Sequence, residues 1–243
     1  MSLGLSRLQR KGLRRFGLVV LASQSPRRRY LLEQLGAEMG FQVQVLVPES
    51  SEDAESLERV EPGELPLDYV TRVTHLKARA GWQRMRRWVA DRTLSLAPVL
   101  VSDTTVVLGD EILGKPASAE EARNMLRSLS GRVHQVHTAV GLALPGGSNA
   151  GVDSVGDQPN SLFDYVQVIS SSDVKFGGLT DGWIDWVIAT GEPMDKAGAY
   201  AIQGHAASVV EWVRGSPSGV MGLPLFETRK LLQSHLGQNP TWL

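Results

Sequence analysis

Residues 16–36 of the chain read "FGLVVLASQSPRRRYLLEQLG". The first half is a short apolar run rich in valine and leucine, which is typical of a buried β-strand. Ser25 suits the N-cap of a helix, Pro26 suits its first position, and Gly36 suits the residue just after its C-terminus. The stretch therefore predicts a strand, a tight turn and a helix, which is a starting unit of a sheet covered by helices.

The same stretch has an unusual charge pattern. Arg27, Arg28 and Arg29 occupy the first turn of the predicted helix, where the helix dipole disfavours cations. The backbone N–H groups of a helix start can bind an anion, Ser23 and Ser25 would add hydroxyl donors, and guanidinium groups bind phosphate in a bidentate way. These residues are a candidate phosphate site, and the alternative is that the arginines simply lie on the surface.

Apolar and polar periodicity continues through the rest of the chain. Strands are predicted within residues 41–48, 97–114 (with a turn at 109–110), 132–145, 163–176 and 206–216, and helices within residues 67–92, 118–130, 180–191 and 222–236. This interleaving predicts an α/β architecture in one domain with two lobes, spanning residues 17–243. Residues 1–16 form a basic N-terminal extension, and residues 145–160 form a loop rich in Gly, Ser, Asn and Asp.

Composition excludes several classes of function. The 243 residues are 42% hydrophobic with a net charge of −1, which argues against a general nucleic-acid-binding protein. There are no cysteines, so disulfides, thiolate nucleophiles and Cys-based zinc sites are excluded. No apolar run approaches the roughly 18 residues that a membrane-spanning helix needs. A cytoplasmic protein with no membrane partner is the default expectation.

Polar residues follow several of the predicted elements. Asp103 and Thr104 lie in an apolar strand, and Lys115 lies in a Gly-Lys-Pro turn before a helix for which Ser118 is the predicted N-cap. A carboxylate at such a position, near a lysine, suits metal binding or base catalysis on a phosphate ester. Lys77 lies at the edge of the apolar stripe of the long helix. Taken singly, a turn aspartate and surface or snorkelling lysines are the simpler interpretation.

The segment "TGEPMDKAGAYAIQG", residues 190–204, is too polar for a core helix. Lys196 and Gln203 lie within it, and its glycines would allow the backbone to approach a ligand closely. The isolated histidines do not suggest a His-based metal site, so any metal should be a hard ion such as Mg²⁺ or Mn²⁺ on oxygen ligands.

Taken together, the segments resemble the Maf family of nucleotide pyrophosphatases. The matching pieces are "LASQSPRR", "YVTRVTHLKARA", "SDTTVVLGDEILGKPASAEEARNMLRSLSGRVHQVHTAV", "TGEPMDKAGAYAIQG" and "GSPSGVMGLPLFET". The resemblance implies a mixed β-sheet flanked by helices, with two lobes around a deep cleft, similar to the inosine triphosphate pyrophosphatase fold. It also implies hydrolysis of a nucleoside triphosphate to the monophosphate and pyrophosphate with a divalent metal.

The resemblance assigns roles to individual residues. Asp103 is the implied proton acceptor, and Glu49 with Asp103 is the implied metal site, with Glu52 as the alternative acid. Arg27, Thr104 and Gln203 imply a preference for dTTP and UTP. The phosphate- and substrate-binding residues are Ser23, Ser25, Arg27, Arg28, Lys77, Lys115, Lys196 and Gln203. Arg29 is not part of the family pattern and is interpreted as surface charge.

Other functions remain open at this point. A non-catalytic nucleotide-binding regulator of cell division or septum formation would bind a nucleotide without turnover, and another phosphohydrolase would release phosphate in place of pyrophosphate. A homodimer is consistent with the family resemblance.

Overall fold

The computed structural model of the protein describes residues 17–49, 52, 56–90, 96–146 and 163–237. The expected basic extension at residues 1–16 and most of the expected loop at residues 145–160 lie outside this part of the chain. The strands are β1 Leu18–Leu21, β2 Gln42–Val45, β3 Val99–Leu108, β4 Glu111–Leu113, β5 Val133–Pro145, β6 Phe163–Phe176 and β7 Val210–Arg214. The α-helices are α1 Pro26–Met39, α2 Pro66–Ala90, α3 Ala119–Leu129, α4 Asp181–Ala189, α5 Pro217–Val220 and α6 Leu225–Leu236, with short 3₁₀ turns η2 Ser56–Glu58, η3 Glu192–Asp195, η4 Ala197–Ala199 and η5 His205–Ser208.

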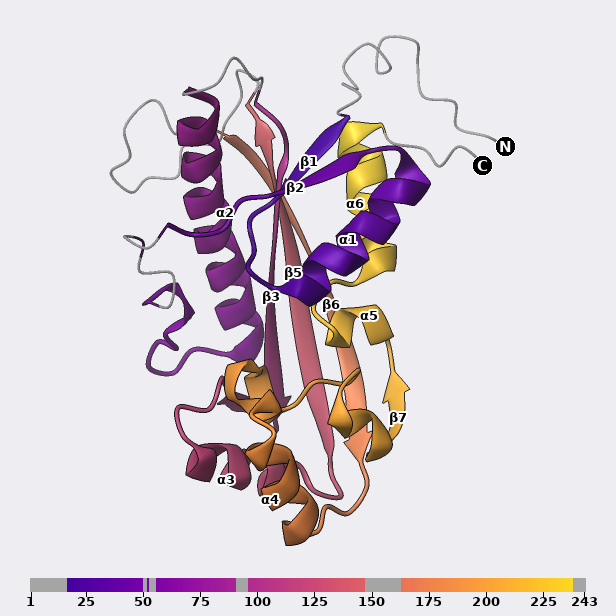
Figure 1. The fold of residues 1–243 in the computed structure, drawn as a ribbon. Helices are drawn as coiled ribbons and strands as arrows, with labels where there is room; N and C mark the ends of the chain where they lie inside the picture. Colours follow the sequence, from indigo (N-terminus) through magenta and orange to yellow (C-terminus); the bar gives the residue numbers. More distant parts are fainter. Residues whose placement is uncertain (1–16, 50–51, 53–55, 91–95, 147–162, 238–243) are drawn as a thin grey trace.

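The strands of the described residues form one mixed sheet in the order β2-β1-β3-β5-β6-β7, with β4 paired to β3. Strand β1 runs parallel to β2 and β3, whereas β3, β5, β6 and β7 pair antiparallel in sequence. The long strands β3, β5 and β6 run the length of the molecule and connect its two halves (Figure 1). The predicted mixed α/β sheet flanked by helices is confirmed.

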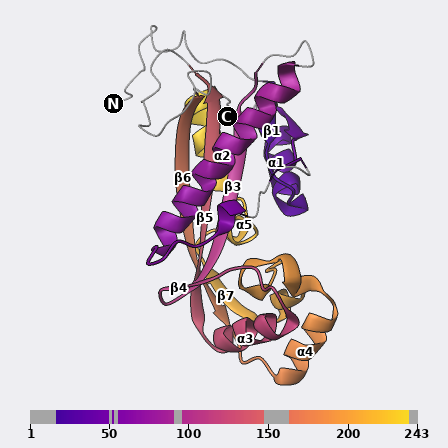
Figure 2. The same cartoon turned by 90° about the vertical axis from the view of Figure 1, so that its left-hand side faces the viewer.

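Alternating side chains of β1 divide the core of the larger lobe into two layers. Val19 and Leu21 pack with α1 and α6 on one face of the sheet. Val20 points to the opposite face and packs with Trp82 and Met85 of α2. Because successive side chains of a strand point to opposite faces, this short apolar strand is buried on both sides. Figure 1 shows α2 and α1 on opposite sides of the sheet, and in Figure 2 helix α2 lies across its near face.

Helix α1 begins where the sequence predicts and ends later. The Ser25 hydroxyl accepts a hydrogen bond from the Arg28 backbone N–H at 3.4 Å, and Pro26 is the first helical residue. The predicted stop at Gly36 is wrong, because the helix continues to Met39 and Gly40 takes the left-handed conformation at φ 80°. A side chain at Gly36 would meet the Phe41 carbonyl oxygen at 2.7 Å, so this glycine allows the chain to fold back against the helix.

The smaller lobe is built from the far ends of the long strands together with β4, β7, α3 and α4. Its core includes Leu126, Val136, Phe176 and Ile184. The N-cap predicted for α3 is confirmed, since the Ser118 hydroxyl accepts from the Glu121 N–H at 3.1 Å. The strand predicted from residue 206 begins only at β7, because η5 turns the chain just before it. None of the helices in the described ranges is long and apolar enough to cross a membrane.

Candidate active site

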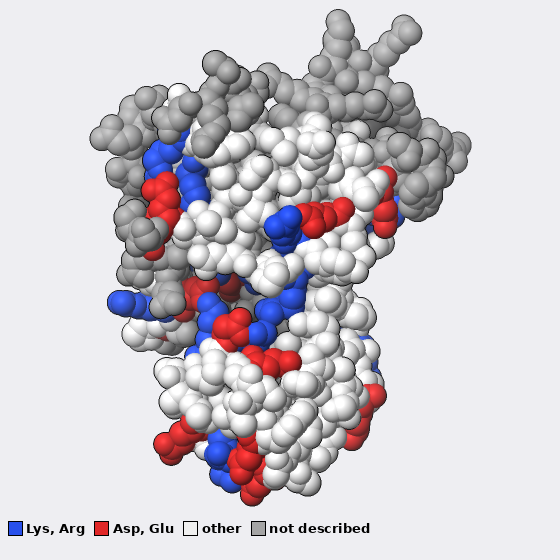
Figure 3. Space-filling view, viewed as in Figure 1, with Lys and Arg blue, Asp and Glu red and all other residues white. Residues whose placement is uncertain are grey.

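A cavity of about 740 Å³ lies between the two lobes. The space-filling view shows a hollow at the waist of the molecule, with Lys, Arg, Asp and Glu side chains gathered around it (Figure 3). Its walls come from the start of α1, the middle of α2, strand β3 and the segment after α4. Ten of the residues predicted to form the site line it: Ser23, Ser25, Arg27, Arg28, Lys77, Asp103, Thr104, Lys115, Lys196 and Gln203.

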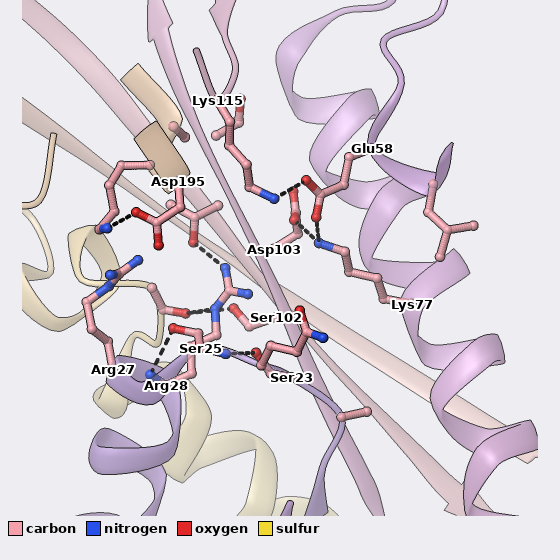
Figure 4. Close-up of a pocket in the computed structure, with 18 of the residues that line it drawn as sticks. Ser23, Ser25, Arg27, Arg28, Glu58, Lys77, Ser102, Asp103, Lys115 and Asp195 are labelled. Carbon is pink, nitrogen blue, oxygen red and sulfur yellow. Dashed lines mark hydrogen bonds and ion pairs between the residues drawn. The ribbon is translucent and has the colours of Figure 1, made fainter. Parts of the chain in front are cut away.

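The start of α1 forms one wall of the cavity. The Ser25 N–H donates to the Ser23 hydroxyl at 3.1 Å, which shapes the turn between strand and helix. The guanidinium of Arg28 donates from Nε to the Gly222 carbonyl at 3.0 Å and from Nη2 to the Thr104 hydroxyl at 3.1 Å. Arg28 therefore links helix α1, strand β3 and the loop after α5 (Figure 4).

The three arginines of this helix start have different surroundings. Arg27 and Arg28 line the cavity, whereas Arg29 does not. The Arg29 side chain is 60% exposed and pairs with Glu33 one turn later at 2.7 Å. The interpretation of Arg29 as surface charge agrees with this position. The unfavourable positive charge at the helix start is thus offset in two ways. Arg29 forms an exposed i,i+4 ion pair, and Arg28 donates hydrogen bonds to other walls of the cavity.

A row of alternating charges forms the opposite wall. Lys77 Nζ lies 2.5 Å from Asp103 Oδ1 and 2.7 Å from Glu58 Oε1. Lys115 Nζ lies 2.6 Å from the other oxygen of the same carboxylate, Glu58 Oε2. The row comes from four parts of the sequence: η2, α2, β3 and the loop after β4. Figure 4 shows the four side chains converging on the cavity.

Glu58 is strongly stabilised in its ionised form. Burial by itself would raise the pKa of this carboxyl group, but the charges and hydrogen bonds of Lys77 and Lys115 outweigh burial and lower the pKa to about 2. The carboxylate is therefore charged throughout the neutral pH range. A fixed anion between two lysines keeps both ammonium groups inside the cavity, where a polyphosphate would need them.

The segment after α4 forms the third wall. Lys196 pairs with Asp195, and its Nζ also donates to the Glu192 carbonyl at 3.2 Å. Ala199, within η4, has a left-handed φ of 61°, which is strained for a residue other than glycine. The neighbouring Tyr200 hydroxyl lies 2.8 Å from His134 Nε2 in the core of the smaller lobe. Tyr200 thus fixes this segment to the core of the smaller lobe, and the segment brings Lys196 and Gln203 to the cavity.

The acidic residue assigned from the sequence is not at the cavity. Glu49 does not line it; its side chain is 57% exposed and lies 3.5 Å from Arg87. Glu52, the alternative, does line the cavity, but Arg84 binds both of its carboxylate oxygens, with Arg84 Nη2 2.5 Å from Glu52 Oε2. The acid that faces Asp103 across Lys77 is Glu58.

Sequence reasoning missed Glu58 because it chose the first acid after β2. Seven acids lie between residues 49 and 64, and nothing in their spacing to β2 separates them. The sequence feature that could have identified Glu58 is its position relative to the helix that follows, not its distance from β2. Glu58 lies upstream of Pro66, where α2 begins, and the segment between them is long enough to run back along this helix as far as Lys77.

The acids at the cavity can be tested against the ligand preferences of a divalent metal. The described residues contain no group of three or more His, Cys, Asp or Glu side chains arranged to hold a metal ion. Asp103 and Glu58 nevertheless offer two carboxylates on either side of Lys77. Mg²⁺ is usually held by one or two carboxylates completed by substrate phosphates and water. The donor set therefore fits a magnesium ion that arrives with a polyphosphate.

Comparison with known proteins agrees with the sequence resemblance. The family model described as "Maf-like protein" matches residues 18–235. The chain belongs to the Maf family. A protein of Cupriavidus metallidurans named "dTTP/UTP pyrophosphatase" is 49% identical over 216 residues, covering 89% of this chain and 96% of that protein. A Ralstonia nicotianae protein of the same name is 49% identical over 212 residues, covering 87% and 91%.

Among solved structures, the Maf-family fold of this chain matches a HAM1 protein from Coxiella burnetii. That match has a TM-score of 0.44 and 12% sequence identity, and it covers 90% of this chain and all of the other.

Proposed function

We propose that this Maf-family protein is a nucleoside triphosphate pyrophosphatase that hydrolyses dTTP and UTP to the monophosphate and pyrophosphate. The observation that carries the proposal is the row Asp103, Lys77, Glu58 and Lys115, which faces a cationic helix start across one cavity. Relatives about half identical over most of both chains carry the name dTTP/UTP pyrophosphatase, which supports the choice of substrate.

Cations on two walls would bind the triphosphate. The N–H groups and serine hydroxyls at the start of α1 suit one phosphate group, and Arg27 adds a guanidinium. Lys77 and Lys115 would exchange part of their contact with Glu58 for phosphate oxygens. Because phosphoryl-transfer enzymes gain most of their rate from positioning and charge stabilisation, these groups carry much of the proposed catalysis.

Asp103 is the proposed base. Its carboxylate is nearly buried at the centre of the cavity wall, and it would accept a proton from a water molecule that attacks the α-phosphorus. The new bond joins the water oxygen to the α-phosphorus, the α–β phosphoanhydride bond breaks, and pyrophosphate leaves. A divalent metal held by Asp103 and Glu58 would supply charge neutralisation for the phosphates when bound.

The base of the nucleotide would lie toward the smaller lobe. Gln203 offers an amide that can both donate to and accept from the edge of a pyrimidine. The Thr104 hydroxyl accepts from Arg28, so its proposed part in specificity includes holding that arginine in place.

Product analysis tests this proposal. The wild-type protein is incubated with each common nucleoside triphosphate, with and without Mg²⁺, and pyrophosphate and phosphate are measured separately. We expect Mg²⁺-dependent release of pyrophosphate, fastest from dTTP and UTP. Release of phosphate would indicate another phosphohydrolase, and nucleotide binding without turnover would indicate a non-catalytic regulator.

A matched pair of variants tests the base. Losing a general base typically lowers the rate by about 10²–10⁴-fold, so Asp103→Asn should nearly abolish pyrophosphate release. Asp110→Asn, in the exposed turn between β3 and β4, is the control and should keep wild-type activity. Full activity of a folded Asp103→Asn variant would contradict the assignment.

A further inference from the structure

The segment that carries Glu58 is bound to α2 by side chains of that helix. The Tyr69 hydroxyl donates to the Glu58 carbonyl at 3.0 Å. Arg72 Nη2 donates to the Arg59 carbonyl at 2.8 Å and lies 2.7 Å from Glu64 Oε2, while Arg72 Nε lies 2.5 Å from Glu64 Oε1. Helix α2 therefore holds both ends of the segment Glu58–Glu64: the backbone carbonyls at its start and the Glu64 side chain at its end.

Tyr69 lies between Arg72 and Lys77 around the circumference of α2. At about 100° per residue, Arg72 is displaced from Tyr69 by about 60° in one direction and Lys77 by about 80° in the other. All three side chains reach the segment 58–64: Tyr69 and Arg72 hold its backbone, and Lys77 holds the Glu58 carboxylate.

The Glu64 carboxylate completes this arrangement. Besides its two contacts with Arg72, it accepts from the Glu61 N–H at 3.1 Å, and its side chain is only 8% exposed. A bidentate arginine–carboxylate pair whose carboxylate is shielded from solvent is more rigid than a fully exposed ion pair. The turn at residues 61–64 is thus tied to the same arginine that binds the Arg59 carbonyl.

We propose that Tyr69 and Arg72 are positioning residues for the reaction, which hold Glu58 so that its carboxylate bridges Lys77 and Lys115. The proposal rests on the proposed function, in that it requires Glu58 to matter for pyrophosphate release. Neither residue needs to touch the substrate for this role; each acts on the backbone of Glu58 or of the residue that follows.

The neighbourhood of Tyr69 suits a permanent hydrogen-bond donor. Burial and the negative charges of Asp103 and Glu58 raise the pKa of its hydroxyl well above the usual range, so it stays protonated at every working pH. The opposite oxygen, the Glu58 carbonyl, can only accept. Removing the hydroxyl would release the carbonyl and let the short η2 turn move relative to Lys115.

A double-mutant cycle tests the proposal. Tyr69→Phe, Glu58→Gln and the combined variant are compared with wild type by kcat/KM for pyrophosphate release from dTTP. One lost hydrogen bond corresponds to about a fivefold to tenfold effect, so Tyr69→Phe should lower kcat/KM by about that factor. In the Glu58→Gln background the same change should have almost no further effect, because the carboxylate it positions is gone.

A second variant and a control keep the test independent of folding. Arg72→Lys keeps the positive charge but loses the planar guanidinium that contacts both Glu64 oxygens and the Arg59 carbonyl, and it should lower kcat/KM only when Glu58 is present. Tyr165→Phe removes another largely buried tyrosine hydroxyl, one that donates to Gln167 outside the cavity, and should leave kcat/KM unchanged. Melting temperatures of all variants are measured alongside.

The outcomes separate this proposal from the proposed function. An equal loss for Tyr69→Phe in both backgrounds, or no loss in either, would overturn the positioning role. If Glu58→Gln is as active as wild type while Asp103→Asn is inactive, the pyrophosphatase function stands and the positioning role is overturned. Absence of pyrophosphate release from the wild-type protein would overturn both.

Discussion

Glu58 Oε2 lies 2.6 Å from Lys115 Nζ, and this ion pair joins the segment bound to α2 with the loop that leads to α3. The same carboxylate binds Lys77 through its other oxygen. Protein carboxylates therefore neutralise both of these lysines within the cavity. Under the proposed function, a triphosphate would compete with Glu58 for both ammonium groups, so we expect this acid to influence binding as well as the reaction.

The first prediction separates the two candidate acids. Glu58→Gln removes the charge between the two lysines and should lower kcat/KM for dTTP by about 10²-fold, the scale of a lost electrostatic group in an active site. Glu49→Gln is the matched control, because that side chain is exposed on Arg87 and should leave kcat/KM within about twofold of wild type. The measurement is pyrophosphate release at a fixed Mg²⁺ concentration. The reverse result would return the acidic site to Glu49.

The second prediction divides the arginines of the helix start. Arg27 lines the cavity, and loss of a charge-assisted hydrogen bond to phosphate should raise the KM for dTTP by about tenfold or more in Arg27→Ala. Arg29 pairs with Glu33 on the surface, and Arg29→Ala should leave KM unchanged. Initial rates over a range of dTTP concentrations give both values. Equal KM values for the two variants would contradict this division.

The helix starts could be predicted from the sequence because they depend on neighbouring residues. Ser25 and Ser118 both accept the expected N–H hydrogen bond from the residue three positions later. The end of α1 could not be predicted in the same way. Gly36 and Gly40 are both suited to end a helix, and the choice between them depends on how closely Phe41 packs against the helix.

In the candidate site, too, the residues in local motifs could be predicted, and the residue placed by distant contacts could not. Asp103, Lys77 and Lys115 are each recognisable within a local motif, and the structure brings them together. Glu58 belongs to an acidic stretch without a fixed period. Its position depends on contacts with Lys115, 57 residues away, and with Lys77, 19 residues away, which only the folded chain reveals.

The third prediction concerns Gly222, which accepts the Arg28 hydrogen bond. Its φ of 117° is rarely adopted by other residues, and a Cβ there would lie 3.2 Å from Arg28 Nε. Gly222→Ala should therefore lower the free energy of unfolding by about 1–3 kcal/mol and raise the KM for dTTP as Arg28 is displaced.

Gly178→Ala is the control for this change. Gly178 lies in the exposed loop before α4, at an ordinary φ, and a Cβ there meets nothing within 4 Å. Denaturant unfolding and KM are measured for both variants. Two alanine variants with the same unfolding free energy would show that the conformation at Gly222 carries no strain.

The fourth prediction uses the buried His134, which is 2% exposed and lies 2.8 Å from the Tyr200 hydroxyl. Burial lowers its pKa from 6.5 to about 4, so the folded protein holds the neutral imidazole. Below pH 6.5 the imidazole of His134 becomes protonated in the unfolded chain while it stays neutral in the folded protein. The free energy of unfolding therefore keeps its full value from this residue above pH 6.5 and falls as the pH is lowered toward 4, by at most about 3 kcal/mol.

The free energy of unfolding, measured by denaturant titration from pH 7.5 to pH 4, should fall for the wild-type protein across this range. His134→Gln should be less stable at pH 7.5, because a flexible amide cannot reproduce the edge-on packing of the imidazole ring against Phe176, and its curve should be flatter below pH 6.5. Burial also lowers the pKa of His137, so part of the pH dependence of the unfolding free energy remains in that variant. If His134→Gln instead follows the wild-type curve in parallel, the imidazole is not held neutral and the loss of stability in acid has another origin.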